Sequence, residues 1–369
     1  MKRAVAAAIS LMTGLAMLTG CSRAEVEETI QPLVADAIEE SDSEAEAVKE
    51  EDESPLIPEI DTDIKIHAGS RIAVVSKCVK GEYWKMVKKG MEDAVKEINK
   101  AYGYKKDDQI TMTFEGPDNE EDVETQINTI DAVIAENPDV LCISASDMDS
   151  CEAQLEAAKE NGIPVIAFDS NVAEKKLVKA YRGTDNVQVG KMAAYQLGSA
   201  LGKMGKVAVF SAQQKTKSVQ DRVEGFMNNI GKYGDIEVVE TIYSDQVDDM
   251  EASMKEVLEK YPTLDGVFCT NADITEMYLN LEKSDEHDAP ALVGVDATTK
   301  QQEAIRNGEE IGCVSQQPYA MGYQTIWAAV ETTAPKKSVV IEKNVLNNPA
   351  WIDADCLDDP DYSGYLYTE

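Results

Sequence analysis

The chain has 369 residues and a formal net charge of −34, because 69 Asp and Glu side chains outnumber 35 Lys and Arg. This charge excludes a nucleic-acid partner, since affinity for a phosphate backbone requires clustered cationic side chains. Only two histidines occur, His67 and His287, so neither a histidine metal site nor histidine general-base catalysis is expected. The length predicts two domains with additional segments.

The first twenty residues are typical of an export signal. Lys2 and Arg3 precede an uncharged run, residues 4–20, which is shorter than the roughly 20 apolar residues that span a bilayer. Small residues lead directly into Cys21, and this pattern resembles a bacterial lipobox, which implies that Cys21 is lipidated and begins the mature chain. An ordinary signal peptide followed by a chance cysteine is the alternative. We predict a signal peptide over 1–20 and a lipid anchor at the outer face of the cytoplasmic membrane.

An acidic tether is predicted to follow, over residues 21–65. Residues 22–63 contain 16 Asp or Glu against two basic residues. Such a segment cannot bury enough apolar surface to offset its ordering entropy, and its like charges repel one another. We expect it to be disordered and to hold the globular part away from the membrane surface.

From residue 70 onward, short apolar runs alternate with segments of helical periodicity. Trp84, Val87, Met91, Ala94 and Ile98 recur at three- or four-residue spacing and predict one face of a helix. Continuous apolar strands separated by helices predict parallel sheets covered on both faces. About ten strands exceed one comfortable sheet, so the predicted fold class is α/β with two doubly wound parallel-sheet lobes. The predicted strands include residues 72–75, 110–114, 140–143, 165–168, 207–210, 236–242, 266–269 and 292–295.

Polar and aromatic side chains follow several of these strands, where ligands of open α/β sheets bind. A sugar ring stacks its C–H faces on Tyr or Trp, and its hydroxyls exchange hydrogen bonds with Asp, Asn, Gln and Arg side chains. A monosaccharide or polyol is therefore the ligand class that these residues fit best. The candidate ligand-binding residues are Tyr83, Trp84, Asp169, Arg222, Asn271, Asp296 and Gln316.

Four motifs together resemble the ribose-type, type I periplasmic sugar-binding proteins of ABC importers, over residues 70–343. The motifs are residues 162–165 leading into Asp169, 183–186 with Gly190, 221–226, and 293–296. The resemblance implies that Tyr83 and Trp84 form the aromatic pair that holds the sugar. It also implies that the hydroxyl-binding positions are Asp169, Arg222, Asn271, Asp296 and Gln316.

The resemblance further implies three crossovers between the lobes, near Thr184, Gln316 and Val345. The predicted N-terminal lobe comprises residues 66–184 and 317–345, and the C-terminal lobe residues 185–316 and 346–369. The implied function is capture of a solute by lobe closure and its delivery to an ABC permease and its ATPase. We expect a monomer without a cofactor or metal. A sugar or signal-molecule sensor that feeds a receptor kinase or chemoreceptor is the alternative.

The chain departs from the ribose-type pattern at three places. Gly81 and Glu82 stand where ribose binders have an Asn before the aromatic pair, and Ser170 stands where an Arg follows the first Asp. After the predicted strand 236–242, Asp245 or Gln246 replaces an expected aromatic residue. These departures leave a different pentose, a hexose, a polyol and a furanose-like signal molecule open as ligands.

Several candidates also have a purely structural interpretation. Asp169, Asp296 and Asn271 could cap turns or helices, as short polar residues after strands often do. Arg222 could be a solvated surface residue, and Tyr83 and Trp84 could belong to the core. Asp185 and Asn186 are interpreted as structural residues that cap the helix after the first crossover.

An enzymatic function is not expected. Asp169 and Asp296 could in principle form the acid and nucleophile pair of a cell-surface glycosidase, which requires one carboxyl with a raised pKa. However, Arg222 in the same site would keep a nearby carboxylate ionised.

The cysteines contribute little chemistry, because Cys142, Cys269 and Cys313 lie in apolar strands, where cysteine packs as a small hydrophobe.

Overall fold

The computed structural model describes residues 56–281, 289–335 and 339–368. These residues belong to one structural unit, Leu56–Glu369. The predicted signal peptide, the lipidation site Cys21 and the tether up to residue 55 lie outside the described residues. In the part of the chain that is described, no helix is both long enough and apolar enough to cross a bilayer.

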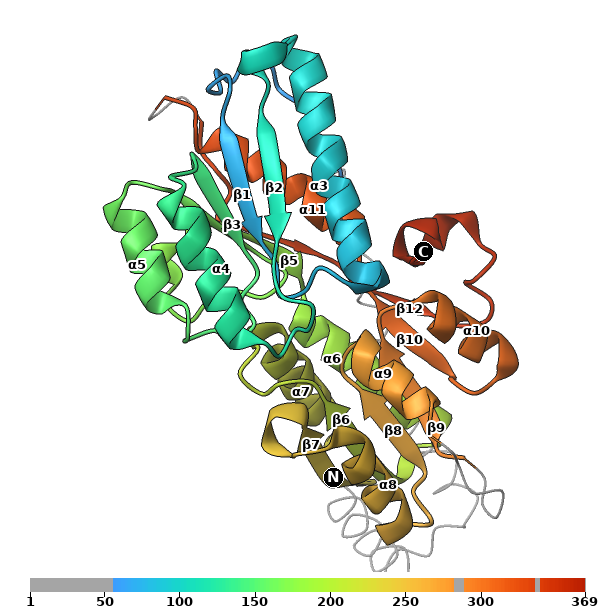
Figure 1. Cartoon of the computed structure of the whole chain (residues 1–369). Helices are drawn as coiled ribbons and strands as arrows, with labels where there is room; N and C mark the ends of the chain where they lie inside the picture. Colours follow the sequence, from blue (N-terminus) through green and yellow to red (C-terminus); the bar gives the residue numbers. More distant parts are fainter. Residues whose placement is uncertain (1–55, 282–288, 336–338, 369) are drawn as a thin grey trace, which may run out of the picture. The chain divides into compact units, whose positions relative to one another are not determined.

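The unit contains two sheets of six strands each (Figure 1). The first sheet has the order β11-β5-β4-β3-β1-β2, and every pair in it is parallel. Its strands are β1 (Arg71–Val75), β2 (Thr111–Glu115), β3 (Val140–Ile143), β4 (Val165–Phe168), β5 (Ala180–Thr184) and β11 (Asn344–Asn347).

The second sheet has the order β12-β10-β9-β8-β6-β7. Its pairs are parallel except for β12, which runs antiparallel to β10. Its strands are β6 (Met204–Ser211), β7 (Asp235–Tyr243), β8 (Gly266–Cys269), β9 (Ala291–Val295), β10 (Gly312–Ser315) and β12 (Ala350–Ile352). The predicted fold class, two α/β lobes with mainly parallel sheets, is confirmed.

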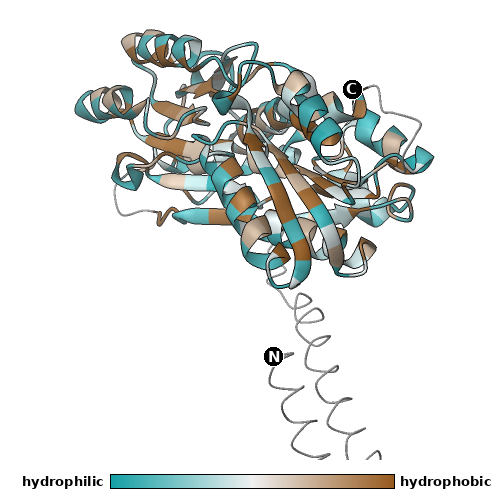
Figure 2. Cartoon of the chain, turned by 90° about the horizontal axis from the view of Figure 1, so that it is seen from below, coloured by the Kyte–Doolittle hydropathy of each residue, from teal (hydrophilic) through white to brown (hydrophobic). Residues whose placement is uncertain are grey.

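Helices cover both faces of each sheet, as the continuous apolar strands require. On the first sheet, α3 (Gly81–Tyr102) and α11 (Pro318–Glu331) pack on one face, and α4 (Val123–Ala135) and α5 (Glu152–Glu160) on the other. On the second sheet, α6 (Asn186–Ala200) and α7 (Lys217–Ile230) face α8 (Met250–Lys260) and α9 (Ala272–Leu279) across the strands. Figure 2 shows the hydrophobic residues concentrated on the strands between these layers.

The chain passes between the two sheets three times. It leaves the first sheet between β5 and α6, returns between β10 and α11, and leaves again between β11 and β12. The C-terminal segment then continues over the second sheet through a 3₁₀ helix, η4 (Pro360–Tyr365), while α10 (Thr299–Asn307) connects β9 to β10. Three connections that lie side by side are the arrangement around which two lobes can hinge.

Residues 56–65 differ from the tether that the sequence analysis predicts for them. Ile60 and Ile64 pack against the core beneath α3 and α11. Tyr102 donates a hydrogen bond to the Ile64 carbonyl oxygen at 2.8 Å, and Gln324 donates one to the Leu56 carbonyl oxygen at 2.7 Å. These contacts attach the stretch to the first lobe. The acidic composition of this stretch predicts disorder, but its two isoleucines pack against the core and order it.

Cysteines lie inside the apolar strands, as predicted. Cys142 in β3 and Cys313 in β10 are fully buried free thiols, and Cys269 in β8 is fully buried as well. Burial raises the pKa of the Cys142 thiol far above its usual range, so it stays protonated and unreactive. These cysteines therefore pack as apolar side chains.

Candidate functional site

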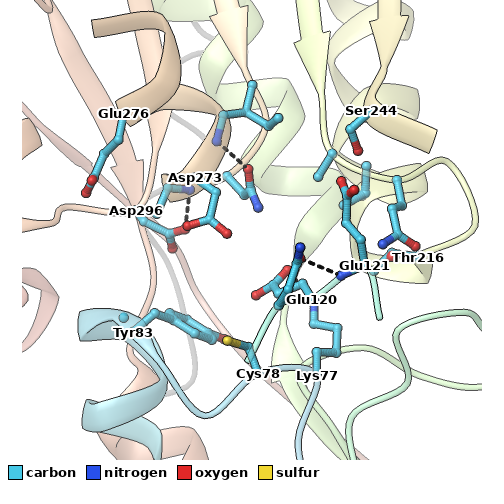
Figure 3. Close-up of a pocket in the computed structure, with 18 of the residues that line it drawn as sticks. Lys77, Cys78, Tyr83, Glu120, Glu121, Thr216, Ser244, Asp273, Glu276 and Asp296 are labelled. Carbon is cyan, nitrogen blue, oxygen red and sulfur yellow. Dashed lines mark hydrogen bonds and ion pairs between the residues drawn. The ribbon is translucent and has the colours of Figure 1, made fainter. Parts of the chain in front are cut away.

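A cavity of about 720 Å³ lies between the carboxyl ends of the two sheets. Its wall contains side chains from β-strand ends, helix starts and loops of both lobes (Figure 3). All seven residues that the sequence analysis selects line it, namely Tyr83, Trp84, Asp169, Arg222, Asn271, Asp296 and Gln316. The structure thus brings together residues that span more than two hundred positions of the chain.

Asp169 is the first residue after β4 and is only 4% exposed. Its backbone adopts a left-handed φ of +54°, which turns the side chain away from the strand. One carboxylate oxygen accepts a hydrogen bond from Tyr83 Oη at 2.7 Å, and the other accepts one from Ser144 Oγ at 2.7 Å. Burial raises the pKa of this carboxyl, but the Lys77 ammonium and these hydrogen bonds outweigh burial and lower the pKa below its usual value.

Lys77 is a buried cation that the sequence analysis does not identify. Its Nζ lies 3.0 Å from Asp169 Oδ2 and 3.6 Å from Glu120 Oε2, and it lies 5.7 Å from the centre of the Trp84 ring. Burial lowers the pKa of the ammonium, but Asp169 and Glu120 raise it above its usual value. The only sequence signal for this role is the position of Lys77, two residues after the end of β1.

Tyr83 and Trp84 lie in the first turn of α3 and contact each other edge to face, with ring centroids 5.1 Å apart. Trp84 is 3% exposed, packs against Phe168, and donates its indole N–H to Glu120 Oε1 at 2.8 Å. Burial and the neighbouring Asp169 raise the pKa of Tyr83 well above its usual range, so its hydroxyl remains a donor. Both aromatic rings therefore belong to the core and also line the cavity. Their interpretation as core residues and their interpretation as ligand-binding residues are thus compatible.

Asp296 occupies the equivalent place in the second lobe, directly after β9, with a left-handed φ of +78°. Its Oδ2 accepts the Ala272 backbone N–H at 3.0 Å. Its Oδ1 accepts Gln316 Nε2 at 2.7 Å and Tyr367 Oη at 2.9 Å. Gln316 in turn accepts a hydrogen bond from Thr184 Oγ1 at 2.8 Å, so the Asp296 carboxylate and the connections between the lobes share one hydrogen-bond network.

Arg222 is a buried residue of α7, 3% exposed, and not a surface residue. Its Nε donates to Asn186 Oδ1 at 2.8 Å and its Nη1 donates to the Thr270 carbonyl oxygen at 2.7 Å. Within the described residues Nη2 has no hydrogen-bond partner, and the residue lines the cavity. Asn186, interpreted from the sequence as structural, therefore also orients the guanidinium.

Two glycines of the recognised motifs bring α6 and α7 close enough to position Arg222. A Cβ at Gly190 would lie 1.9 Å from the Arg222 carbonyl oxygen, and one at Gly225 would lie 2.2 Å from the Val187 carbonyl oxygen. Any larger residue would separate the helices. The motif spacing thus reflects packing as much as ligand contact.

Two helix caps follow the structural interpretation of the sequence. Asp185 caps α6 by accepting the Gln188 N–H at 3.0 Å, as predicted. Asn271 caps α9 by accepting the Ile274 N–H at 3.1 Å, while its side chain also lines the cavity. The Asn271 amide oxygen therefore accepts one hydrogen bond within the protein, and its N–H₂ group is available to a ligand.

Asp273 lies in the first turn of α9 and is a further cavity residue that the sequence analysis does not identify. Enclosure by the cavity walls raises the pKa of its carboxyl to about 7, and the neighbouring carboxylates Glu120, Glu276 and Asp296 act in the same direction. The side chain is nevertheless exposed to solvent, which screens the repulsion between these carboxylates. This side of the cavity is therefore crowded with negative charge.

The two lobes touch on either side of the cavity. Glu82 Oε2 accepts the Thr299 N–H at 2.7 Å, at the start of α10. On another edge, Ser170 and Ser218 share a hydrogen bond of 2.6 Å, and Thr216 Oγ1 donates to the Ser146 carbonyl oxygen at 2.6 Å. These contacts hold the lobes together around the cavity. Among the residues that the structure describes, no group of three His, Cys, Asp or Glu side chains is arranged to hold a metal ion.

Residues 72–337 match the family model of the periplasmic binding protein domain. The chain is 26% identical to the ribose import binding protein of Bacillus subtilis over 220 residues, which are 60% of this chain and 71% of that protein. It is 25% identical to the xylitol-binding protein of Mycolicibacterium smegmatis over 57% of this chain and 60% of that protein. A solved ABC transporter solute-binding protein from Agrobacterium vitis with bound D-fucose is 26% identical, with a TM-score of 0.72 over 81% of this chain and 100% of that one.

Proposed function

Because the chain belongs to the type I periplasmic sugar-binding protein family, we propose that it captures a monosaccharide or polyol between its lobes and delivers it to an ABC permease. The observation that carries the proposal is the cavity itself. Its wall combines two strand-end carboxylates, Asp169 and Asp296, one from each lobe, with a buried guanidinium and an aromatic hydroxyl. A small polyhydroxylated ligand would be contacted by both lobes at once.

The chemistry of the wall supports a ligand with many hydroxyl groups. Carboxylates accept from hydroxyls, the Arg222 Nη2 and Asn271 Nδ2 groups donate to them, and the rings of Tyr83 and Trp84 offer surfaces for C–H faces. Hydrogen bonds to charged groups contribute about 1.5–3 kcal/mol each. Three or four of them together contribute about 4.5–12 kcal/mol, a range that includes the roughly 8 kcal/mol of a Kd of about 1 μM.

Lobe closure is the proposed mechanism of capture. A ligand favours the closed state only by contacts that the open state lacks. Asp169 and Tyr83 would supply contacts from the first lobe, and Arg222, Asn271 and Asp296 would supply them from the second. Each lobe has its own core, so the three connections between the sheets can absorb the rotation with little disruption of either.

Binding without chemical conversion is the expected outcome at this site. A glycosidase requires a carboxylic acid that remains protonated near neutral pH beside the sugar. The pKa of the Asp169 carboxyl is instead lowered, because Lys77 and two hydroxyl donors outweigh the effect of burial. Asp169 is therefore ionised at neutral pH and cannot act as that acid in a pair with Asp296. Asp273 is the cavity carboxyl with a raised pKa, but it is not a member of that pair.

The location of the protein is proposed from the family and from the N-terminal sequence. Periplasmic binding proteins act outside the cytoplasm, and the lipobox-like sequence before Cys21 supports anchoring of the mature chain by a lipid at the outer face of the cytoplasmic membrane. The charged segment after Cys21 would then separate the binding unit from the membrane. We expect a monomeric carrier that docks on a permease with a separate ATPase.

Calorimetry and thermal unfolding of the protein beginning at residue 22 test the proposal, with a panel of pentoses, hexoses, hexosamines and polyols. A true ligand at about 100 times its Kd raises the free energy of unfolding by about 2.7 kcal/mol, because only the folded state binds it. A true ligand should also reduce the radius of gyration measured by small-angle X-ray scattering, because the lobes close around it. Failure of every sugar and polyol to bind, or release of a converted product, would contradict the proposal.

A further inference from the structure

The cavity wall carries an excess of negative charge. Three cations line it, Lys77, Lys80 and Arg222. Nine carboxylates line it, Glu82, Asp118, Glu120, Glu121, Asp169, Asp248, Asp273, Glu276 and Asp296. A neutral sugar would leave this imbalance unchanged, so the arrangement of the charges bears on the ligand.

The three cations are already engaged by other groups. Lys77 pairs with Asp169 at 3.0 Å and with Glu120 at 3.6 Å, and Lys80 pairs with the exposed Asp118 at 2.5 Å. Arg222 donates to an amide oxygen and a backbone carbonyl oxygen. The two lysines, both from the first lobe, are therefore paired with carboxylates there, whereas Arg222 of the second lobe donates only to neutral oxygens.

Three carboxylates of the second lobe have no cation paired with them in the described part of the chain. Asp273 and Glu276 lie one turn apart on α9, and Asp296 follows the neighbouring strand; Figure 3 shows the three close together, with Glu120 across the cavity. Neither Asp273, Glu276 nor Asp296 forms an ion pair within the described residues. Lys300 is near, but its ammonium binds the Glu276 carbonyl oxygen and the Asn280 side chain, not a carboxylate.

A second feature shows that the cavity is built for a polar ligand. Gln213 is only 5% exposed and lines the cavity, yet its side-chain amide has no hydrogen-bond partner among the described residues. The polar atoms of this amide are accessible from the cavity, so a ligand can donate to its oxygen and accept from its N–H₂ group. The wall therefore presents unused hydrogen-bonding capacity beside the uncompensated charge.

We propose that the ligand carries a cationic amino group in addition to its hydroxyls, and that Asp273, Glu276 and Asp296 bind the ammonium. An amino sugar or an amino polyol has this chemistry. The inference deepens the proposed function and depends on it. Asp169, Arg222 and Tyr83 would bind the hydroxyls on the first-lobe side and in the centre, while the ammonium enters the anionic side.

Electrostatics support this assignment. Asp273 faces Glu120, Glu276 and Asp296 as like charges, with Lys77 as the opposing cation, and enclosure together with these carboxylates raises its pKa to about 7. An ammonium among them would favour the ionised form. Ligand binding and deprotonation of Asp273 are therefore coupled, and the affinity for a cation should rise with pH until this carboxyl is ionised.

Isothermal titration calorimetry at pH 7.0 tests the inference with matched sets of ligands. D-glucosamine, D-galactosamine, D-mannosamine and 1-amino-1-deoxysorbitol are compared with their neutral parents and with the N-acetylated sugars. At least one amine should bind ten times more tightly than its neutral parent and its N-acetyl form. For that amine, lowering the pH from 7.0 to 5.5 should weaken binding about tenfold, because Asp273 becomes protonated.

Two variants separate the carboxylate from general charge effects. Asp273→Asn should weaken the affinity for the amine tenfold or more and abolish the pH dependence of that affinity. The affinity for the neutral parent should change by less than threefold. Asp118→Asn removes the same charge at the exposed rim of the cavity, where Lys80 neutralises it. This control variant should change the affinity for the amine by less than threefold. If Asp273→Asn does not fold, the pH dependence of the unaltered protein still decides.

The possible failures are distinguishable. Neutral parents that bind as tightly as the amines, or amine binding that is independent of pH and of Asp273, would overturn the inference and leave the proposed function standing. Calcium or magnesium alone binding through Asp273 would overturn it as well. If no sugar or polyol binds, with or without an amino group, the proposed function itself fails.

Discussion

Asp169 and Asp296 occupy equivalent positions in the two lobes, each directly after a strand and each with a left-handed backbone, but their surroundings differ in charge. Asp169 is paired with the buried ammonium of Lys77 at 3.0 Å. Asp296 is held by a backbone N–H, an amide and a phenol, all neutral donors. The same local backbone therefore presents a neutralised carboxylate in one lobe and an anionic one in the other.

This difference has a consequence for ligand selectivity. A neutralised carboxylate can still orient a hydroxyl, but it attracts a cation weakly. Among the described residues, the Asp296 carboxylate has only neutral donors as partners and no cation paired with it, and it lies beside Asp273 and Glu276. Two lobes with the same architecture can thus recognise two different ends of one ligand.

Removal of the buried Lys77 ammonium should have the largest effect on the difference in charge between the two lobes. Lys77→Met should reduce the free energy of unfolding by about 3–5 kcal/mol, because Asp169 and Glu120 lose their counter-charge in a buried setting. Chemical denaturation measures the loss. The double variant Lys77→Met with Asp169→Asn should recover a substantial part of it; no recovery would show that the lysine acts through packing alone.

The two sides should also respond to pH in opposite directions. The lowered pKa of Asp169 means that its contribution to stability is present above the unfolded pKa of about 3.9 and is lost as pH falls through the lower folded value. The raised pKa of Asp273 means that the folded state binds the extra proton between about pH 4 and 7, so its contribution to stability falls as pH rises through that window.

Thermal unfolding without ligand, from pH 3 to 8, measures both effects. Asp273→Asn should flatten the curve between pH 4 and 7 only, and Asp169→Asn should flatten it below pH 4 only. Because water reaches Asp273, the change in melting temperature at pH 7 should be modest. A curve for Asp273→Asn that parallels the unaltered protein through pH 4–7 would contradict the raised pKa.

The two tyrosines that donate to Asp296 and Asp169 allow the two lobes to be compared by the same substitution, with a smaller expected effect. Tyr367 is 1% exposed and donates to Asp296, as Tyr83 donates to Asp169. Tyr367→Phe should cost about 1.5–3 kcal/mol of unfolding free energy, since a hydrogen bond to a charged group is lost. Tyr83→Phe should cost less, because Lys77 continues to neutralise Asp169. Equal losses in denaturation would argue against the difference in charge.

The contact between lobes at Glu82 should have the smallest effect. Its carboxylate accepts the Thr299 N–H at the start of α10, which favours the closed arrangement. Glu82→Gln should change the unfolding free energy by less than about 1 kcal/mol, while weakening ligand affinity a fewfold through the closed state. Scattering profiles of the ligand-free variant report the change; a large loss of stability would place Glu82 in the fold and not in closure.

The sequence by itself determined the strands and the positions where side chains gather. Runs such as 140–143, 165–168 and 266–269 are continuously apolar because both faces are buried, so periodicity predicts them with correct bounds. Six of the seven candidate residues follow strands or begin helices, and the rule that ligands bind at strand ends brings them to one cavity, whereas Arg222 lies in the second turn of α7. By contrast, β11 has four residues, two of them polar, and β12 has only three residues, which leaves no pattern to detect.

Only the tertiary structure decided the charge of each side of the cavity. Lys77 and Asp169 are 92 positions apart, Tyr367 and Asp296 are 71 apart, and nothing in the local sequence at either position indicates its partner. Whether a carboxylate is neutralised depends on distances of a few ångströms and on burial, both of which arise from packing of the whole chain. Hydrophobic patterns are local and can be read along the chain, whereas the electrostatic environment of a site is created only when distant segments meet.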